Sequence, residues 1–248
     1  MPRGELQICR DAGGVAAALA DYFVDIGCTA ITDRGVFHVA LSGGNTPRAA
    51  FSLLAREPRA IELTWKDVCI FFGDERCVGP EDPQSNYRMA EETFLREVPV
   101  LPENVHRMRG EIDPAQAAAE YAQTLRGTLG DPPRFDLVLL GMGPDGHTAS
   151  LFPGSPPNED DDALVRAVYA KSQMMWRITV TPKVINSARN VIFAIEGSEK
   201  AQVFAAVYNG PFEPSTYPSQ IVDPTDGRLI YLVDELAAGV VTGAAEAH

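Results

Sequence analysis

The chain has few cysteines, few histidines and a shortage of basic residues. Its four cysteines contain no C-x-x-C pair and its four histidines are scattered, so the sequence does not predict a metal site. Lysine and arginine number 21 against 34 aspartates and glutamates, which gives a formal net charge of −13. Nucleic acids and anionic membranes attract clustered cations, so this balance argues against both as partners. An anionic ligand would need a local cluster of cations to override the global repulsion.

The chain also lacks an export signal and a long apolar run. The stretch near the N-terminus is short, rich in alanine and glycine, and flanked by Asp11 and Asp21. A signal peptide instead begins with basic residues that precede an apolar core. No uninterrupted apolar run approaches the roughly 18 residues of a membrane span. We therefore expect a cytoplasmic protein whose thiols stay reduced.

Apolar segments alternate regularly with helical patterns. With 248 residues, 45% of them hydrophobic, the chain is long enough for one large domain, which we expect to span residues 1–248. The pattern predicts strands at 36–41, 68–73, 135–141, 190–196 and 228–234. It predicts helices at 15–26, 114–129 and 197–208, a helix that begins after Thr46 as its N-cap, and a helix that begins near residue 87. Such alternation is typical of an α/β fold with a mostly parallel sheet and helices on both faces. The proline-rich segments 153–162 and 211–227 are interpreted as surface loops.

Ligands of open α/β sheets bind at the carboxyl ends of the strands. Ser42, Gly43 and Gly44 lie there, between a predicted strand and a helix start. Backbone N–H groups and the helix dipole could hold a phosphate at this place. A tight turn that requires glycine explains the same residues, so both interpretations stay open.

Charged side chains follow two other predicted strands. Asp74 and Arg76 come directly after 68–73, where an arginine could hold an anion and a carboxylate a hydroxyl group. Solvated charges at a strand end are the ordinary alternative. Lys200 lies in the first turn of a predicted helix, where its charge opposes the helix dipole. An anionic ligand over that helix start would remove the conflict, although an exposed lysine needs no ligand.

The glycine loop at 141–148 contains the remaining candidates. Its G-x-G-x-x-G pattern matches a dinucleotide fingerprint, but Asp145 lies inside the loop and prolines follow closely, so we reject a nucleotide site. His147 comes directly after the last glycine. Histidine exchanges protons near neutral pH, which makes His147 a candidate general base. A purely structural histidine is the alternative.

Five motifs occur together and in order: ALSGGNTP (40–47), FFGDERCV (71–78) with SNYRMA (85–90), FDLVLLGMGPDGHTASLFPGSP (135–156), RITVTPKVIN (177–186) and IEGSEKA (195–201). Over nearly its whole length the sequence resembles the 6-phosphogluconolactonases. The resemblance implies a modified Rossmann-like fold shared with the glucosamine-6-phosphate deaminases. It also implies hydrolysis of 6-phosphoglucono-δ-lactone to 6-phosphogluconate, in the oxidative pentose phosphate pathway, without a metal or cofactor.

Two other functions compete with this one. The deaminases share the glycine–histidine loop, but a glutamate of their acid/base relay stands where this chain has Phe152. Sugar isomerisation needs several proton transfers, whereas lactone opening needs one base that becomes one acid, so Phe152 favours the hydrolase. A non-catalytic sugar-phosphate sensor usually needs a DNA-binding module, for which this acidic chain has neither room nor charge. The presence of both Asp145 and His147 also favours an enzyme.

The residues and the resemblance together predict a mechanism. His147 is the expected general base and then general acid. Asp74 or Asp145 is expected to orient its imidazole, and the resemblance favours a functional Asp74 without deciding between them. The expected phosphate ligands are Ser42, Gly43, Gly44, Arg76 and Lys200, with Arg177 as a weaker candidate. The expected partner is a small sugar-phosphate lactone, bound by a monomer or a small homo-oligomer.

Overall fold

A six-stranded sheet forms the centre of the computed structural model, which describes residues 3–154 and 162–245. The strands lie in the order β1-β9-β8-β5-β2-β3, and every neighbouring pair is parallel. Their bounds are β1 (Glu5–Cys9), β2 (Phe37–Leu41), β3 (Val68–Phe72), β5 (Leu137–Leu140), β8 (Asn190–Ile195) and β9 (Arg228–Asp234). The predicted α/β class and parallel sheet are confirmed. The edge strand β1 was not predicted.

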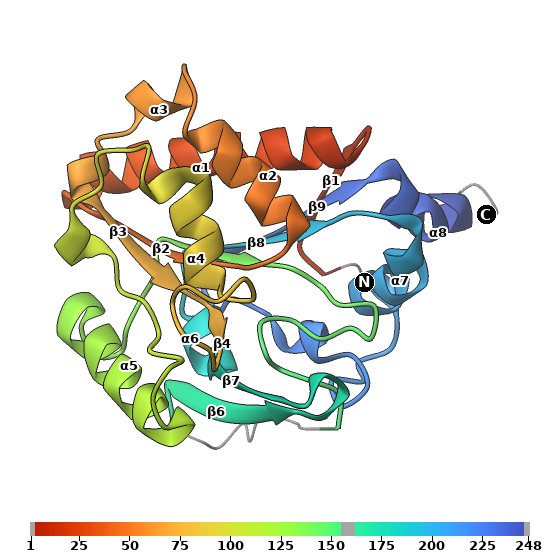
Figure 1. Cartoon of the computed structure of the whole chain (residues 1–248). Helices are drawn as coiled ribbons and strands as arrows, with labels where there is room; N and C mark the ends of the chain where they lie inside the picture. Colours follow the sequence, from red (N-terminus) through yellow and green to blue (C-terminus); the bar gives the residue numbers. More distant parts are fainter. Residues whose placement is uncertain (1–2, 155–161, 246–248) are drawn as a thin grey trace.

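Helices cover both faces of this sheet, as the continuous apolar runs predict. In β3, Val68, Ile70 and Phe72 join the hydrophobic cluster on one face, while Cys69 and Phe71 join the cluster on the other. The first face carries α1 (Ala12–Arg34), α2 (Asn45–Leu54), α3 (Arg59–Glu62) and α4 (Asn86–Ala90), and the second carries α5 (Pro114–Leu129), α6 (Pro182–Asn186), α7 (Ala201–Asn209) and α8 (Glu235–Ala245). Figure 1 shows α1 and α2 above the sheet and α5 below it.

The first helix is longer than the predicted 15–26. Asp11 caps its start by accepting a hydrogen bond from the N–H of Gly14, and Gly35 ends it in the left-handed conformation at φ 78°. By length and hydropathy this helix could also cross a membrane. In the structure its apolar face lies against the sheet, where Leu19 and Phe23 are almost completely buried.

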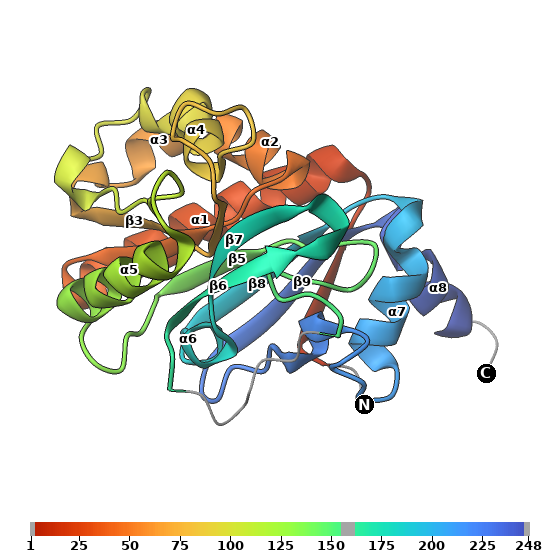
Figure 2. The same ribbon diagram turned by 60° about the horizontal axis from the view of Figure 1, so that its bottom comes forward.

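A second, antiparallel sheet was not predicted. It consists of β4 (Asp74–Arg76), β7 (Met175–Val180) and β6 (Val165–Ala170), in the order β4-β7-β6. β4 has three charged residues and no apolar alternation, so the sequence offers no strand pattern there. Figure 2 shows β6 and β7 in front of the central strands, on the face of the sheet that carries α5, and β4 directly follows the carboxyl end of β3. This sheet therefore forms a wall beside the loops predicted to bind ligands.

Several predicted boundaries are wrong. Thr46 is not an N-cap, because α2 begins at Asn45 after Gly44, which adopts φ 107° and supplies no capping side chain. The predicted helix 197–208 is a 3-10 turn, η5 (Ser198–Lys200), followed by α7, and α8 was not predicted at all. Other short helical turns are η1 (Trp65–Asp67), η2 (Glu91–Leu95), η3 (Pro102–Asn104), η4 (Lys171–Gln173) and η6 (Pro218–Ile221).

Of the two segments predicted as surface loops, only 211–227 lies wholly within the described residues. Most of 153–162 lies outside the described residues, which stop at 154 and resume at 162. The segment 211–227 is only in part a surface loop. It contains η6, in which Ser219 and Gln220 are almost fully buried. Side-chain hydrogen bonds explain how two polar residues are accommodated there.

Candidate active site

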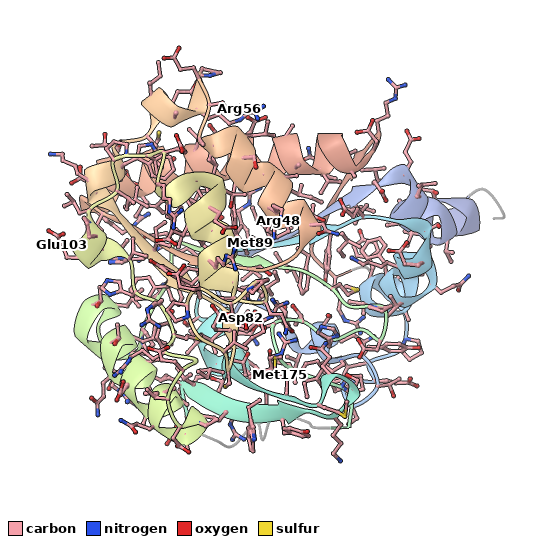
Figure 3. All side chains as sticks on the ribbon, in the orientation of Figure 1. Arg48, Arg56, Asp82, Met89, Glu103 and Met175 are labelled. Carbon is pink, nitrogen blue, oxygen red and sulfur yellow. The ribbon has the colours of Figure 1, made fainter. Side chains whose placement is uncertain are left out.

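Loops from the carboxyl ends of β2, β5 and β8 meet the small sheet around one cleft of about 290 Å³. Figure 3 labels Asp82, in the loop between β4 and α4, and Met175, where β7 begins beside the cleft wall. The predicted site residues that line the cleft are Ser42, Gly43, Gly44, Asp74, Arg76, His147, Arg177 and Lys200. Asp145 lies next to the cleft and contacts His147. The fold thus brings together residues from five separate sequence motifs.

His147 and Asp145 form a dyad. Oδ1 of Asp145 lies 2.5 Å from Nδ1 of His147 and also accepts the backbone N–H of His147 at 3.2 Å. Burial acts to raise the pKa of the Asp145 carboxyl, but the hydrogen bond and charge of His147 outweigh burial and hold that pKa below its usual value. With Nδ1 engaged, Nε2 is the ring nitrogen left for a ligand in the cleft.

The imidazole is held between two neighbours. On one side it lies against the backbone of Gly143, where a Cβ atom would overlap the ring. On the other side is the ring of Phe152, with ring centroids 4.8 Å apart. The need for glycine at 143 therefore comes from the close approach of His147 rather than from a phosphate.

Asp74 also lines the cleft and makes different contacts. Its Oδ2 accepts a hydrogen bond from the hydroxyl of Ser150 at 2.7 Å and lies 3.9 Å from Nη1 of Arg177, while Oδ1 lies 3.3 Å from Nδ2 of Asn86. Asp74 is 7% exposed, so it is not a solvated charge at a strand end. Of the two predicted carboxylates, the one that contacts the imidazole is Asp145.

Arg76 and Arg177 form a pair of cations at the cleft. They are directly opposite in the β4–β7 register, and both line the cavity. Arg76 donates to the carbonyl of Gln84 and Arg177 to the side-chain oxygen of Gln173, yet in the described chain the Nε of each is buried without a hydrogen-bond partner. Burial and the charge of Arg76 lower the pKa of Arg177. An anion in the cleft would satisfy both guanidinium groups.

The loop 42–44 adds backbone donors to the same cavity. Gly44 supplies no side-chain cap, so the first N–H groups of α2 lack a side-chain capping partner. A Cβ at Gly43 would overlap the amide of Asn86, which explains glycine at this position. Lys200 reaches the cleft from η5, and within residues 3–154 and 162–245 it has no ion pair. Glu196 and Glu199 line the cavity near it.

Sequence reasoning missed two residues that shape the cleft, Glu75 and Asn86. Glu75 is 2% exposed and accepts hydrogen bonds from the backbone N–H groups of Arg76, Asn86 and Tyr87 and from the hydroxyl of Ser85. Burial raises the pKa of this carboxyl, and the hydrogen bonds act against that rise. Glu75 thereby fixes the start of α4, where Asn86 contacts both Asp74 and Gly43. The signal for both was their place in quoted motifs, Glu75 in FFGDERCV and Asn86 in SNYRMA.

No group of three or more His, Cys, Asp or Glu side chains in the described part of the chain is arranged to hold a metal ion. The described residues at the cleft supply a histidine–carboxylate dyad, a pair of guanidinium groups, an amine, further carboxylates and backbone N–H groups.

Comparison with models of known protein families shows which family this chain belongs to. The family model described as "Glucosamine-6-phosphate isomerases/6-phosphogluconolactonase" matches residues 10–231. The chain belongs to this family. That match extends from the start of α1 into β9 and includes every predicted site residue.

Individual members of the family point to one of its two named activities. The chain is 39% identical to a 6-phosphogluconolactonase of Synechocystis, over 84% of this chain and 86% of that protein. It is 36% identical to a probable 6-phosphogluconolactonase of rice, Oryza sativa subsp. indica, over 94% of this chain and 89% of that one. The solved 6-phosphogluconolactonase of Trypanosoma cruzi superposes with a TM-score of 0.85 at 28% identity and covers 97% of each chain.

Proposed function

We propose that this protein hydrolyses 6-phospho-D-glucono-1,5-lactone to 6-phospho-D-gluconate, the lactonase step of the oxidative pentose phosphate pathway. The single observation that carries the proposal is the His147–Asp145 dyad facing a cleft with two incompletely paired guanidinium groups. Its relatives named 6-phosphogluconolactonase support the same activity.

In this mechanism His147 is the general base. Nε2 takes a proton from a water molecule as the water oxygen attacks the lactone carbonyl carbon, which forms a tetrahedral oxyanion. The imidazolium then returns the proton to the ring oxygen as the carbon–oxygen bond of the lactone breaks. Asp145 holds Nδ1 and stabilises the imidazolium. Proton transfer of this kind typically contributes about 10²–10⁴-fold to the rate.

The 6-phosphate is the proposed ligand of the cationic side of the cleft. Arg76, Arg177 and Lys200 supply the charge, and the N–H groups of the 42–44 loop supply further donors. Asp74 is then free to accept a hydrogen bond from a sugar hydroxyl and to orient Arg177. Anchoring the phosphate at one end of the substrate fixes the carbonyl at the other end against His147. A lactone carbonyl is already electrophilic, so we propose that water is the only co-reactant.

The other activity in the family's name is disfavoured by Phe152. Its ring packs on His147 at the position where the deaminase pattern has a glutamate, so no carboxylate stands there for the second proton transfer. A non-catalytic sensor would have no need of the dyad. Both alternatives predict that the lactone is not hydrolysed.

One assay distinguishes these functions. Freshly generated 6-phosphogluconolactone is offered to the protein, and acid release is followed above the spontaneous rate, while ammonia release from glucosamine 6-phosphate is measured in parallel. We expect rapid acid release and no ammonia. Ammonia without lactone hydrolysis would overturn the lactonase assignment in favour of a deaminase, and the absence of both products would favour the sensor.

We further propose that the chain forms one domain over residues 1–248, acts in the cytoplasm, and does so as a monomer or small homo-oligomer. Gel filtration with light scattering measures the last of these directly.

A further inference from the structure

The loop that carries His147 is held from its outer side by a segment far away in the sequence. The carbonyl oxygen of Gly146 accepts two hydrogen bonds from Ser219, one from its backbone N–H at 2.9 Å and one from its hydroxyl at 2.8 Å. Ser219 is 0% exposed. Because this serine is buried and its hydroxyl bonds to the Gly146 carbonyl beside the dyad, we interpret its role as fixing the position of that carbonyl.

The segment that carries Ser219 is itself firmly attached. Gln220, 1% exposed, donates from Nε2 to the carbonyls of Ala206 and Pro211, both at 2.8 Å, and its Oε1 accepts the N–H of Glu213. These bonds join η6 to the C-terminal part of α7. Ser219 is therefore presented to the loop from a fixed support.

Two side chains, those of Tyr217 and Val203, leave little space beside Gly146. Gly146 adopts φ 79°, and a Cβ there would meet the ring of Tyr217 at 2.9 Å and a methyl group of Val203 at 3.2 Å. Tyr217 and Val203 therefore leave no room for a side chain at position 146, which together with the positive φ explains glycine there.

One peptide group links Ser219 to the dyad. The carbonyl that Ser219 holds and the N–H of His147 belong to the same planar peptide. That N–H donates to Oδ1 of Asp145, the oxygen that also contacts Nδ1 of the imidazole. Ser219 fixes one end of the peptide and Asp145 the other, so rotation of the peptide would break the bond between backbone and carboxylate.

We propose that Ser219 is a positioning residue for catalysis: by holding the Gly146 carbonyl it keeps Asp145 on Nδ1 of His147 and Nε2 in the cleft. This inference rests on the proposed function, because it assigns Ser219 a role in the same proton transfer. It concerns orientation of the imidazole and not binding of the phosphate.

The test is the variant Ser219→Ala, which removes the hydroxyl but keeps the backbone N–H. We expect kcat for the phosphorylated lactone to fall about tenfold, since small misplacements of a catalytic group are costly, while KM changes by less than about twofold because ground-state binding is untouched. The matched control is Ser187→Ala. The Ser187 hydroxyl also donates to two backbone carbonyls, those of Pro133 and Val184, and it lies outside the cleft lining.

A second readout does not depend on activity. The ¹⁵N chemical shifts of the two His147 ring nitrogens report which one carries the proton, and they are assigned by comparison with His147→Gln. We expect one dominant tautomer, protonated on Nδ1, in the parent protein and in Ser187→Ala, and a mixture in Ser219→Ala. Ser219→Cys keeps a weak donor, so its kcat and its tautomer mixture should be intermediate between those of Ser219→Ala and the parent protein. If Ser219→Ala does not fold, Ser219→Cys is the variant to measure.

Four results would overturn the proposal: a kcat of Ser219→Ala within about twofold of the parent, an equal fall in Ser187→Ala, a change confined to KM, or unchanged ring shifts. A parent protein without lactonase activity would refute the proposed function, and the ring shifts would still decide whether Ser219 orients the imidazole.

Discussion

Arg76 and Arg177 are cross-strand partners on β4 and β7, two like charges side by side, and in the part of the chain described each keeps a buried Nε without a hydrogen-bond partner. Like charges directly opposite each other on a sheet destabilise it. The pair is best explained as a site that is completed when an anion binds, and it makes the recognition of phosphate the first property to test.

Replacing Arg76 or Lys200 with alanine should weaken recognition of the phosphorylated substrate. Losing a hydrogen bond to a charged group costs on the order of 1.5–3 kcal/mol, so kcat/KM should fall roughly 10–150-fold. Hydrolysis of unphosphorylated glucono-δ-lactone, which we expect to be slow throughout, should hardly change. Steady-state kinetics on both lactones measure this. Arg96→Ala, which removes an exposed arginine paired with Glu91, is the control.

The double variant Arg76→Ala/Lys200→Ala examines whether both cations hold the same phosphate. If they do, the combined loss in kcat/KM should be smaller than the product of the two single losses, because groups that share one partner are not additive. Fully multiplicative losses would place the two cations on different parts of the substrate. Equal losses on the two lactones would rule out a phosphate clamp.

Replacing His147 with alanine should abolish most of the turnover. We expect kcat to fall roughly 10²-fold or more with KM nearly unchanged, because the imidazole acts mainly in the transition state. Turnover close to that of the parent protein would remove His147 from the catalytic role.

Asp145 and Asp74, the two predicted carboxylates, should respond differently to the change to asparagine. Asp145→Asn should lower kcat at least tenfold, on the order of the effect of losing an orienting group, since the amide cannot stabilise an imidazolium. Asp74→Asn should mainly raise KM, because Asp74 contacts Arg177 and Ser150 and not the imidazole. The pKa of Asp145 lies below its usual value, so this carboxyl stays ionised throughout the neutral range. The reverse pattern of kcat and KM would exchange the two roles.

Protein stability should decrease in mildly acidic solution because of two histidines remote from the cleft. Burial lowers the pKa of His38, although Asp136 acts to raise it, and burial together with the nearby His38 lowers the pKa of His106, which stacks on Phe71. The unfolded chain therefore binds more protons below about pH 6.5, the usual histidine pKa, and the free energy of unfolding falls as pH drops through that range. Urea denaturation between about pH 7.5 and 5.5 measures the slope. His106→Gln should reduce it, and an unchanged slope would contradict the assignment.

The central sheet could be predicted from sequence because its signal is local. Runs such as VCIFF in β3 and LVLL in β5 are buried on both faces, and each is followed by a polar loop that turns out to line or adjoin the cleft. His147 and Asp145 were recognisable together because they are two residues apart in one glycine loop. The choice between Asp74 and Asp145 could not be made, since it depends on a contact that spacing does not encode.

Other features could not be predicted because they depend on contacts between residues that are distant in the sequence. β4 is a strand only because β7, about a hundred residues later in the chain, pairs with it. The burial of Glu75 could not be predicted, because three of its four hydrogen-bond donors, Ser85, Asn86 and Tyr87, lie about ten residues later at the start of α4. Segment 211–227 has the proline content of a loop, and only the fold places its buried polar side chains behind the catalytic loop.

Gly73 links the two sheets. Its N–H donates to the carbonyl of Leu41 at the end of β2, and its carbonyl accepts the N–H of Val180 at the end of β7. The strands that carry the two arginines are thus hydrogen-bonded to the end of β2 through Gly73, and Ile178 and Val180 of β7 also pack in the hydrophobic core with residues of the central sheet. Because Arg76 and Arg177 are paired directly across β4 and β7, a substitution of a buried β7 residue such as Ile178 should displace both guanidinium groups together relative to the 42–44 loop.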